Sequence, residues 1–302
     1  MKSIVLLVSI GWFVFGPLAG ADTVELTRRA DTVKVTIDGA PLAIYHTSKD
    51  KLKPYFFEVR AADGTIMSRP ISPPGEDHPH HRGIWNAADK VNGIDFWNER
   101  RGRIDNVAVK LIQAQGNPAV MEVVNHWLDE HGKLIIAEKT NIQIFANRLL
   151  AYDIRLTAGQ QPVTFGDTEE GFFAFRMVNS MREQEGGHVE NADGLKTAAG
   201  CWGKTCDWVD YYGPINGKTY GVALFDHPEN FRRSRYHVRD YGLFSISPFG
   251  QRDYTLGRLP AQPVVLQPGE TLRLRYGMFF HTGNTQDAHL PQVYREYLQN
   301  TQ

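Results

Sequence analysis

The sequence predicts an antiparallel all-β fold, because apolar and polar residues alternate along many short segments. A period of two is typical of strands that are buried on one face only. The clearest examples are segments 33–37, 107–111, 141–145, 152–156 and 272–276. Helical periodicity is scarce, and turns rich in Gly, Pro and Asn separate the segments. Without crossover helices, such strands are expected to form a two-sheet sandwich.

The same patterns predict the remaining elements in chain order. We expect further strands at 55–61, 119–128, 171–178, 219–225 and 242–247. One short C-terminal helix is predicted, from about Leu290 to Gln299, because apolar side chains recur there at helical spacing. No linker, repeat or low-complexity tract divides the chain. Residues 22–302 are therefore predicted to form a single β-sandwich domain.

The first 21 residues have the pattern of a secretory signal peptide. Lys2 gives a positive start, residues 4–18 are apolar, and Ala19-Gly20-Ala21 is a small-x-small cleavage site. The alternative is a membrane anchor, but the apolar run is short for a spanning helix. We expect a periplasmic or secreted protein with no membrane partner once the signal is removed.

The overall charge narrows the class of partner. A formal net charge of -1 over 302 residues gives no electrostatic support for binding nucleic acid. Arginines cluster at 100–103 and 232–235, either as solvated loops or as a rim that attracts acidic substrates. Cys201 and Cys206 are the only cysteines, and an exported location would permit a local disulfide between them.

The most informative segment is Asp77-His78-Pro79-His80-His81-Arg82-Gly83. Histidine exchanges protons near neutral pH and is the commonest metal ligand. Alternate residues of an extended chain face the same way, so His78 and His80 are expected on one side and His81 on the other. His78 and His80 are candidate ligands of a divalent metal, which would need a third ligand from elsewhere. The candidates for that ligand are Glu170, Asp207, Asp210, His227 and His237. The alternative is a structural turn whose histidines hydrogen-bond to the backbone.

Carboxylates and aromatic residues complete the chemistry that the sequence offers. Glu169 and Glu170 precede a predicted strand, and one carboxylate near a histidine suffices for general acid–base catalysis. We favour Glu170, and Arg176 on the same strand could hold a substrate oxygen. The face of Trp85 or Trp208 suits the apolar side of a pyranose ring, although most aromatic residues serve as core.

Two polar segments lie further along the chain. In segment 207–211, Asp207 and Asp210 flank an aromatic cluster. Residues 226–240 follow an apolar strand and repeat an Asp-His-Pro triplet at Asp226-His227-Pro228. Polar loops at strand ends commonly carry binding residues. No Gly-x-Ser-x-Gly elbow and no phosphate-binding glycine loop is present in the sequence.

Several of these segments together resemble a bacterial family of unknown function that carries the label methane oxygenase (PmoA). The resemblance rests on residues 78–85, 91–97, 207–211, 225–230 and 237–250. A weaker resemblance links Leu266-Gln267-Pro268-Gly269-Glu270 and the strand after it to sugar-mutarotase proteins. That resemblance implies a galactose-mutarotase-like antiparallel β-supersandwich and a sugar substrate.

The leading hypothesis is an exported carbohydrate-active enzyme, a hydrolase, lyase or epimerase, that uses His and carboxylate acid–base chemistry on a sugar or glycoside. Its partner would be a small-molecule or oligosaccharide substrate, and no cofactor is certain. The candidate catalytic residues are His80, His81, Glu170 and His227. The candidate substrate-binding residues are Arg82, Trp85, Arg176, Trp208, Asp210, Asn230, Arg232 and His237. Two alternatives stay open: a non-catalytic carbohydrate-binding protein, and the metal-dependent oxygenase or hydrolase that the family label implies.

Overall fold

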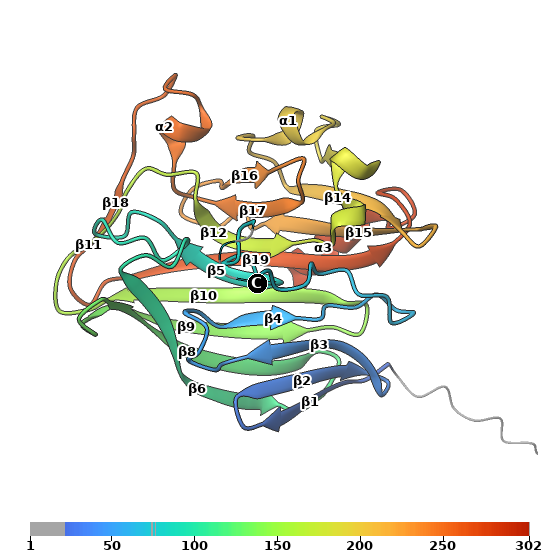
Figure 1. The fold of residues 1–302 in the computed structure, drawn as a ribbon, viewed down its shortest axis with the longest axis horizontal. Coiled ribbons are helices and arrows are strands. Elements are labelled where there is room, and N and C mark those ends of the chain that lie inside the picture. Colours follow the sequence, from blue (N-terminus) through green and yellow to red (C-terminus); the bar gives the residue numbers. More distant parts are fainter. Residues whose placement is uncertain (1–21, 74, 76, 302) are drawn as a thin grey trace, which may run out of the picture.

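The computed structural model describes residues 22–73, 75 and 77–301, which form two large β-sheets packed face to face. The predicted signal peptide, residues 1–21, lies outside the described residues. Figure 1 shows the strands of both sheets crossing the molecule in roughly the same direction. No helix among the described residues is both long enough and apolar enough to cross a membrane.

We call the first of the two sheets sheet I, and its neighbouring strands are antiparallel. It holds the N-terminal strands and the strand that follows the histidine segment. Its order within the described residues is β16 (Arg235–Val238), β17 (Leu243–Ser247), β12 (Gly171–Arg176), β5 (Ile84–Ala88), β4 (Tyr55–Phe57), β3 (Ala40–His46), β2 (Thr32–Ile37), β1 (Val24–Arg29) and β7 (Gln115–Gly116).

The second sheet, sheet II, consists mainly of long strands. Its order within the same residues is β13 (His188–Asn191), β14 (Trp208–Ile215), β15 (Lys218–Asp226), β19 (Thr271–Thr282), β10 (Leu149–Ala158), β9 (Leu134–Ile144), β8 (Ala119–Asp129) and β6 (Gly102–Gln113). The remaining elements are β11 (Val163–Phe165) paired with β18 (Val264–Leu266), the helices α1 (Ala198–Cys201), α2 (Gln251–Tyr254) and α3 (Leu290–Asn300), and the 3-10 turns η1 (Asn179–Met181) and η2 (Glu183–Glu185).

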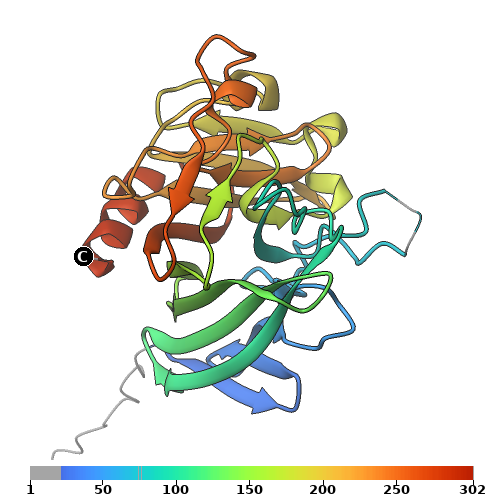
Figure 2. The same cartoon turned by 90° about the vertical axis from the view of Figure 1, so that its left-hand side faces the viewer.

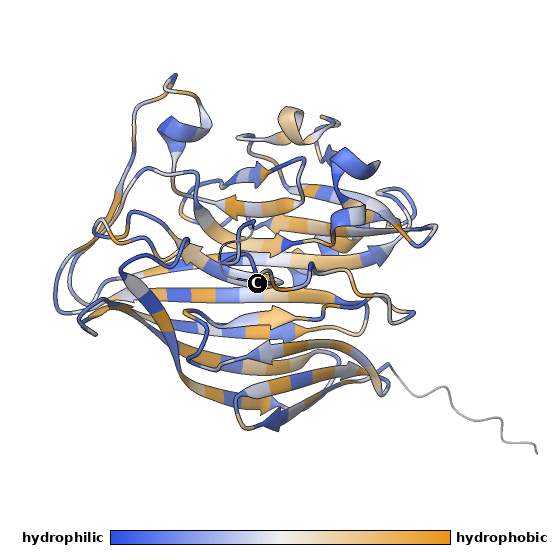
Figure 3. Ribbon diagram, viewed as in Figure 1, coloured by the Kyte–Doolittle hydropathy of each residue, from blue (hydrophilic) through white to orange (hydrophobic). Residues whose placement is uncertain are grey.

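Alternation along the strands of sheet II produces two separate apolar layers. In β10, Leu150 and Tyr152 pack in the core between the sheets. Leu149 and Ala151 point to the other face, where α3 covers them. Figure 3 shows the alternating hydropathy along these strands. Helix α3 therefore covers the part of the outer face of sheet II that β10, β14, β15 and β19 form.

The predicted antiparallel β-sandwich with a short C-terminal helix is confirmed. Four of the five alternating segments lie wholly in strands, and segment 141–145 extends one residue beyond β9. The strand expected at 55–61 ends at Phe57. Strand β5 was missed because four of its five residues are buried, so that its sequence does not alternate. A strand covered on both faces loses the period-two pattern.

The two cysteines form no disulfide. Cys201 and Cys206 are buried free thiols whose sulfur atoms donate to the backbone carbonyls of Leu195 (3.4 Å) and Trp208 (3.3 Å). Burial raises the pKa of each thiol to about 12, so both stay protonated at neutral pH.

A buried carboxylate ties the two sheets together. Glu138 of β9 is 1% exposed and accepts hydrogen bonds on both oxygens. Asn86 of β5 in sheet I donates to it across the sandwich (2.9 Å). Three donors from sheet II complete the set: Asn125 (3.0 Å), Trp127 (2.7 Å) and Thr140 (2.9 Å). A buried charge is tolerated only when such donors surround it.

Replacing this carboxylate should destabilise the fold. Glu138→Ala leaves several buried donors without an acceptor, and we expect a loss of about 3 kcal/mol in the free energy of unfolding. Urea denaturation measures it. The control is Glu122→Ala on neighbouring β8, whose ion pair with Lys139 (2.7 Å) is partly exposed and should contribute under about 1 kcal/mol. Equal losses in the two variants would contradict this role for Glu138.

Candidate active site

The outer face of sheet I, which points away from sheet II, carries the polar side chains. Asn86 and its register partner Phe173 point inward, so their neighbours Trp85 and Ala174 point outward. The outward row continues through the register partners Ser245 of β17 and His237 of β16. This row crosses four strands, and it brings segments near residues 85, 174, 237 and 245 side by side.

The histidine segment lies at one end of this face, where two arginines hold it. The Arg176 backbone N–H donates to the carbonyl of Gly83 (3.0 Å), which joins the loop to β12. The guanidinium groups of Arg69 (3.1 Å) and Arg176 (3.0 Å) both donate to the Asp77 carboxylate. Arg69 also donates to the backbone carbonyl of His78 (2.7 Å). The predicted site residue Arg176 therefore positions the loop.

The three imidazoles form one stacked cluster. His78 stacks on Tyr241 with 5.3 Å between ring centroids, and on His81 at 4.7 Å. His80 meets the edge of His81 at 4.4 Å, and His81 stacks on Trp85 at 5.2 Å. The expectation that His81 faces away from the other two is wrong. The left-handed backbone of His78 (φ 45°) turns the chain there, so the segment is not extended.

Burial keeps His80 and His81 neutral. It lowers the pKa of His80 to about 3, with the Lys53 charge adding to the effect, and lowers the pKa of His81 well below its usual value. Nε2 of His80, both ring nitrogens of His81 and the indole nitrogens of Trp85 and Trp97 are buried without a hydrogen-bond partner among the described residues. Buried polar atoms are normally paired. Their concentration here marks a place suited to a polar ligand.

The candidate metal ligands do not converge. His78 and His80 lie 5.7 Å apart between ring centroids, and His78 Nδ1 contacts the Asp77 carboxylate. Among the described residues, no group of three or more His, Cys, Asp or Glu is arranged to hold a metal ion. The arrangement does not fit a divalent metal.

A second polar group lies further along the same face. Glu170 directly precedes β12, and its carboxylate makes no hydrogen bond to any of the described residues. Burial, reinforced by the charge of Glu169, raises its pKa to about 7. Tyr241 stacks on His78, and burial raises its pKa to about 12, with the Arg239 charge opposing the shift and the Glu170 charge adding to it. A carboxyl group tuned in this way is suited to proton transfer.

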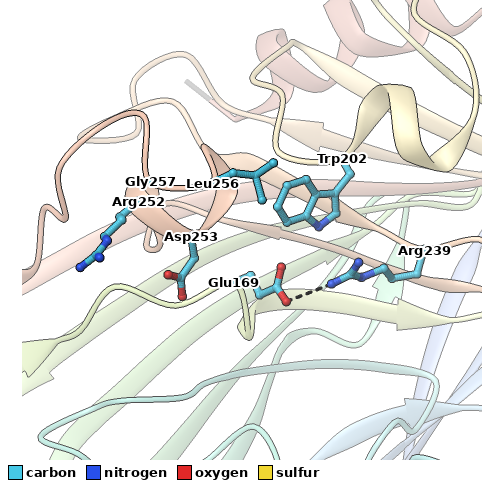
Figure 4. Close-up of a pocket in the computed structure, with 7 residues that line it drawn as sticks. All are labelled: Glu169, Trp202, Arg239, Arg252, Asp253, Leu256 and Gly257. Carbon is cyan, nitrogen blue, oxygen red and sulfur yellow. Dashed lines mark hydrogen bonds and ion pairs between the residues drawn. The ribbon is translucent and has the colours of Figure 1, made fainter.

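A cavity of about 650 Å³ opens beside Glu169, the residue that precedes Glu170, and Glu170 is not among the residues that line it. Figure 4 shows the Trp202 ring lying toward Leu256, with Glu169 and Arg239 joined below it. The Glu169–Arg239 ion pair measures 2.9 Å, and the guanidinium lies 5.5 Å from the Trp202 ring centroid. The cavity is lined by Glu169, Trp202, Arg239, Arg252, Asp253, Leu256 and Gly257. It is both polar and aromatic.

The predicted site residue His237 supports this cavity from beneath. Its Nδ1 donates to the Glu169 carbonyl (2.8 Å), and its Nε2 accepts from Arg239 Nε (2.8 Å). Burial, with the Arg239 charge, lowers its pKa to about 3. His237 is therefore a neutral group that holds Glu169 and Arg239 in place.

Four predicted site residues lie elsewhere, on the outer face of sheet II. Trp208 packs in the apolar cluster beneath α3. On the same side of β14, the buried Asp210 carboxylate contacts His281 (3.0 Å) and accepts from Thr285 (2.8 Å). Figure 2 shows α3 (red) and the loop before β5 (teal) on opposite sides of the molecule. Trp208 and Asp210 are thus structural and remote from the histidine cluster.

His227 and Asn230 belong to the same remote region. The His227 ring packs against Tyr297 of α3 at 5.8 Å, and its Nδ1 accepts from the Glu229 backbone (3.1 Å). Asn230 exchanges hydrogen bonds with the backbone of Arg275 in β19 (2.9 and 2.7 Å). The second Asp-His-Pro triplet therefore fixes a loop to sheet II and does not join the first.

Two more predicted ligand contacts are buried beneath the histidines. Arg82 makes a two-pronged ion pair with Glu99, which Lys53 also contacts (2.8 Å). Trp85 is 2% exposed, with its ring between His81 and Trp97. Neither side chain has a free surface for a substrate, so both support the loop. Arg232 lines a separate cavity of about 240 Å³.

Trp202 and Tyr241 were not among the residues predicted from the sequence. Trp202 follows α1, in a segment whose only earlier signal was the cysteine pair. Tyr241 lies in the turn of the β16–β17 hairpin, two residues after Arg239. The alternation of His237, Arg239 and Tyr241 along that hairpin is the signal that could have identified it.

A family model matches residues 32–295 of the chain. This chain belongs to DUF6807, a family of unknown function. No curated protein matches it. The DUF6807 description names no substrate and no reaction, so function has to be argued from the site.

The chain is also similar to several solved structures. It covers 98% of galactose 1-epimerase from Lactobacillus acidophilus NCFM, at 10% identity and a TM-score of 0.41 over 87% of this chain. The GalM/aldose epimerase homologue from C. elegans is covered completely, at 9% identity and 0.39 over 87% of this chain. The chain spans only 41% of alpha-galactosidase AgaA from Geobacillus stearothermophilus, at 10% identity and 0.42 over 86% of this chain. Scores this low decide nothing about activity.

The raised pKa of Glu170 predicts a pH-dependent stability. A carboxyl whose folded-state pKa lies near 7 stabilises the fold fully below about pH 4.5, and that stability is lost as the pH rises through 7. Relative to Glu170→Gln, the wild type should lose about 2 kcal/mol of unfolding free energy between pH 5 and pH 8. Urea titrations at both pH values measure the difference. Glu229→Gln, at an exposed carboxylate whose pKa Arg275 lowers, should show no such loss. Parallel stability curves for wild type and Glu170→Gln would contradict the shift.

Proposed function

We propose that this protein is an exported carbohydrate-active enzyme that transfers protons to and from a sugar or glycoside, as a hydrolase, lyase or epimerase. The observation that carries the proposal is Glu170. This carboxyl group has a pKa of about 7, lacks a hydrogen-bond partner among the described residues and shares one face of the sandwich with neutral imidazoles.

Glu170 is the proton-transferring group in this proposal. At pH 7 it is close to half ionised, so it can serve as acid or as base. His80 and His81 do not titrate near neutral pH, which changes the role expected from the sequence, where one of them was the second acid–base group. As a neutral imidazole, the half-buried His80 would instead hold and polarise a sugar oxygen, whereas His81 is 1% exposed and packs against His80.

The cavity beside Glu169, one residue before Glu170, supplies the features that a saccharide requires. Its volume lies within the range of about 300–1,000 Å³ that small-molecule sites occupy. Trp202 is partly exposed and offers an aromatic face, the role that the sequence analysis gave to Trp85 and Trp208. Arg239 and Asp253 supply a hydrogen-bond donor and an acceptor for hydroxyl groups.

Turnover by variants tests this assignment. On a panel of glycans, glycosides and oxidised glycosides, Glu170→Gln should lower kcat by about 10²–10⁴, because the proton-transferring group is removed. His80→Ala should lower it about 10-fold or more, through loss of one hydrogen bond to the transition state. Glu229→Gln, on the far side of the molecule, is the control and should match the wild type. Undiminished turnover in both site variants would remove these roles.

Two outcomes would favour the alternative functions. Saturable saccharide binding that Trp202→Ala abolishes, without turnover by the wild type, would indicate a non-catalytic carbohydrate-binding protein. Activity that is lost on dialysis against a chelator and restored by one metal would indicate the metal-dependent oxygenase or hydrolase that the PmoA resemblance implies. We expect turnover to survive the chelator.

A further inference from the structure

A second cavity, of about 240 Å³, is dominated by positive charge. Three arginines from one short segment line it, Arg232, Arg233 and Arg235, together with Thr205, Gln251 and Gln262. Among the described residues that line it there is no aspartate or glutamate. Every polar side chain in this set can donate a hydrogen bond.

Two of the three guanidinium charges have no carboxylate partner. Arg233 forms ion pairs with Asp207 and Asp226 (both 2.9 Å), so its charge is compensated. Arg232 donates to the Gln262 carbonyl (3.1 Å) and Arg235 to the Gly203 carbonyl (2.7 Å). Neither makes an ion pair with any of the described residues. Each guanidinium has five donor hydrogens, so most remain available.

The nearest carboxylate to Arg232 is committed to another task. The pKa of Arg232 is lowered by burial and raised in part by the charge of Asp167. Both oxygens of Asp167 accept from backbone N–H groups at the start of α2, those of Arg252 (3.0 Å) and Asp253 (3.0 Å). The charge of Asp167 is therefore shared with the helix, and the excess of positive charge in the cavity persists.

This cavity adjoins the one beside Glu169. Helix α2 contributes Gln251 to the arginine cavity and Arg252 and Asp253 to the other. Trp202 lines the first cavity, and the carbonyl of the next residue, Gly203, holds Arg235 in the second. A ligand longer than one sugar ring could therefore contact both.

We infer that the arginine cavity is a subsite for an anionic substituent, a carboxylate or a sulfate, of the saccharide that the site accepts. The inference rests on the proposed function, and it narrows the substrate class to acidic saccharides. Paired guanidinium groups suit both anions, because their planar donors match two oxygens at once. The arginine-rich segment 232–235 seen in the sequence thereby gains a role.

Titrations with small probes test the subsite without requiring turnover. The probes are D-glucuronate, its uncharged methyl ester, and inorganic sulfate, followed through the arginine Nε–Hε signals in ¹H–¹⁵N spectra. Wild-type protein should bind glucuronate or sulfate at least tenfold more tightly than the methyl ester. Arg232→Gln/Arg235→Gln should lose that preference. Arg258→Gln, at an exposed arginine of the same loop region that does not line the cavity, should retain it.

Each outcome decides the inference. Tighter binding of glucuronate identifies a carboxylate site, and tighter binding of sulfate a sulfate site. Equal binding of the charged and uncharged probes, absence of binding, or an unchanged preference in the double variant would overturn it. Anion binding without Glu170-dependent turnover would contradict the proposed function and leave the subsite standing. Glu170-dependent turnover without anion binding would remove the subsite alone.

Discussion

The position of β5 in the sandwich depends on one buried carboxylate, Glu138. Its oxygens accept from Asn86 of sheet I and from three donors of sheet II, so it fixes how one sheet lies on the other. The histidine segment leads directly into β5, and Glu170 directly precedes β12, the neighbour of β5. A contact between the sheets therefore sets the placement of groups on the outer surface.

The two outer faces of the sandwich differ in how their polar groups are satisfied. On the α3 side, the His281 ring and Thr285 both contact Asp210, and Asn230 is bonded to the backbone of β19. On the outer face of sheet I, the nitrogens of His81 and the carboxylate of Glu170 lack partners among the described residues. Satisfied groups specify a fold, whereas unsatisfied buried groups cost stability. Such a cost is typical of sites that bind or react.

Local patterns predicted the fold well, and the composition of the site only in part. Alternation identified β2, β6, β9, β10 and β19, and helical spacing identified α3. The sequence grouped segment 77–83 with Glu170, Arg176 and His237, and of these Arg176 contacts Asp77 directly. The sequence did not reveal that the two Asp-His-Pro triplets lie far apart, because they follow strands of different sheets. Which loops share a face depends on strand order in space, and that order is set by long-range pairing rather than by local sequence.

The histidine orientations show the same limit at smaller scale. Alternation assigns sides correctly only where the backbone is extended. At His78 the backbone is left-handed, so His81 stacks on His78 where the pattern placed it on the opposite side. Burial then shifts the pKa of His80 far enough to exclude it as a base at neutral pH. Neither effect is visible in the residues themselves, because both depend on what surrounds them.

The central claim is that ligands bind on the outer face of sheet I. A crystal structure of the protein soaked with a saccharide that it turns over or binds tests this most directly. We predict that the sugar lies between Glu170 and Trp202, with an oxygen near the His80 imidazole. A sugar bound only beside His227 and α3, on the far side of sheet II, would contradict the account.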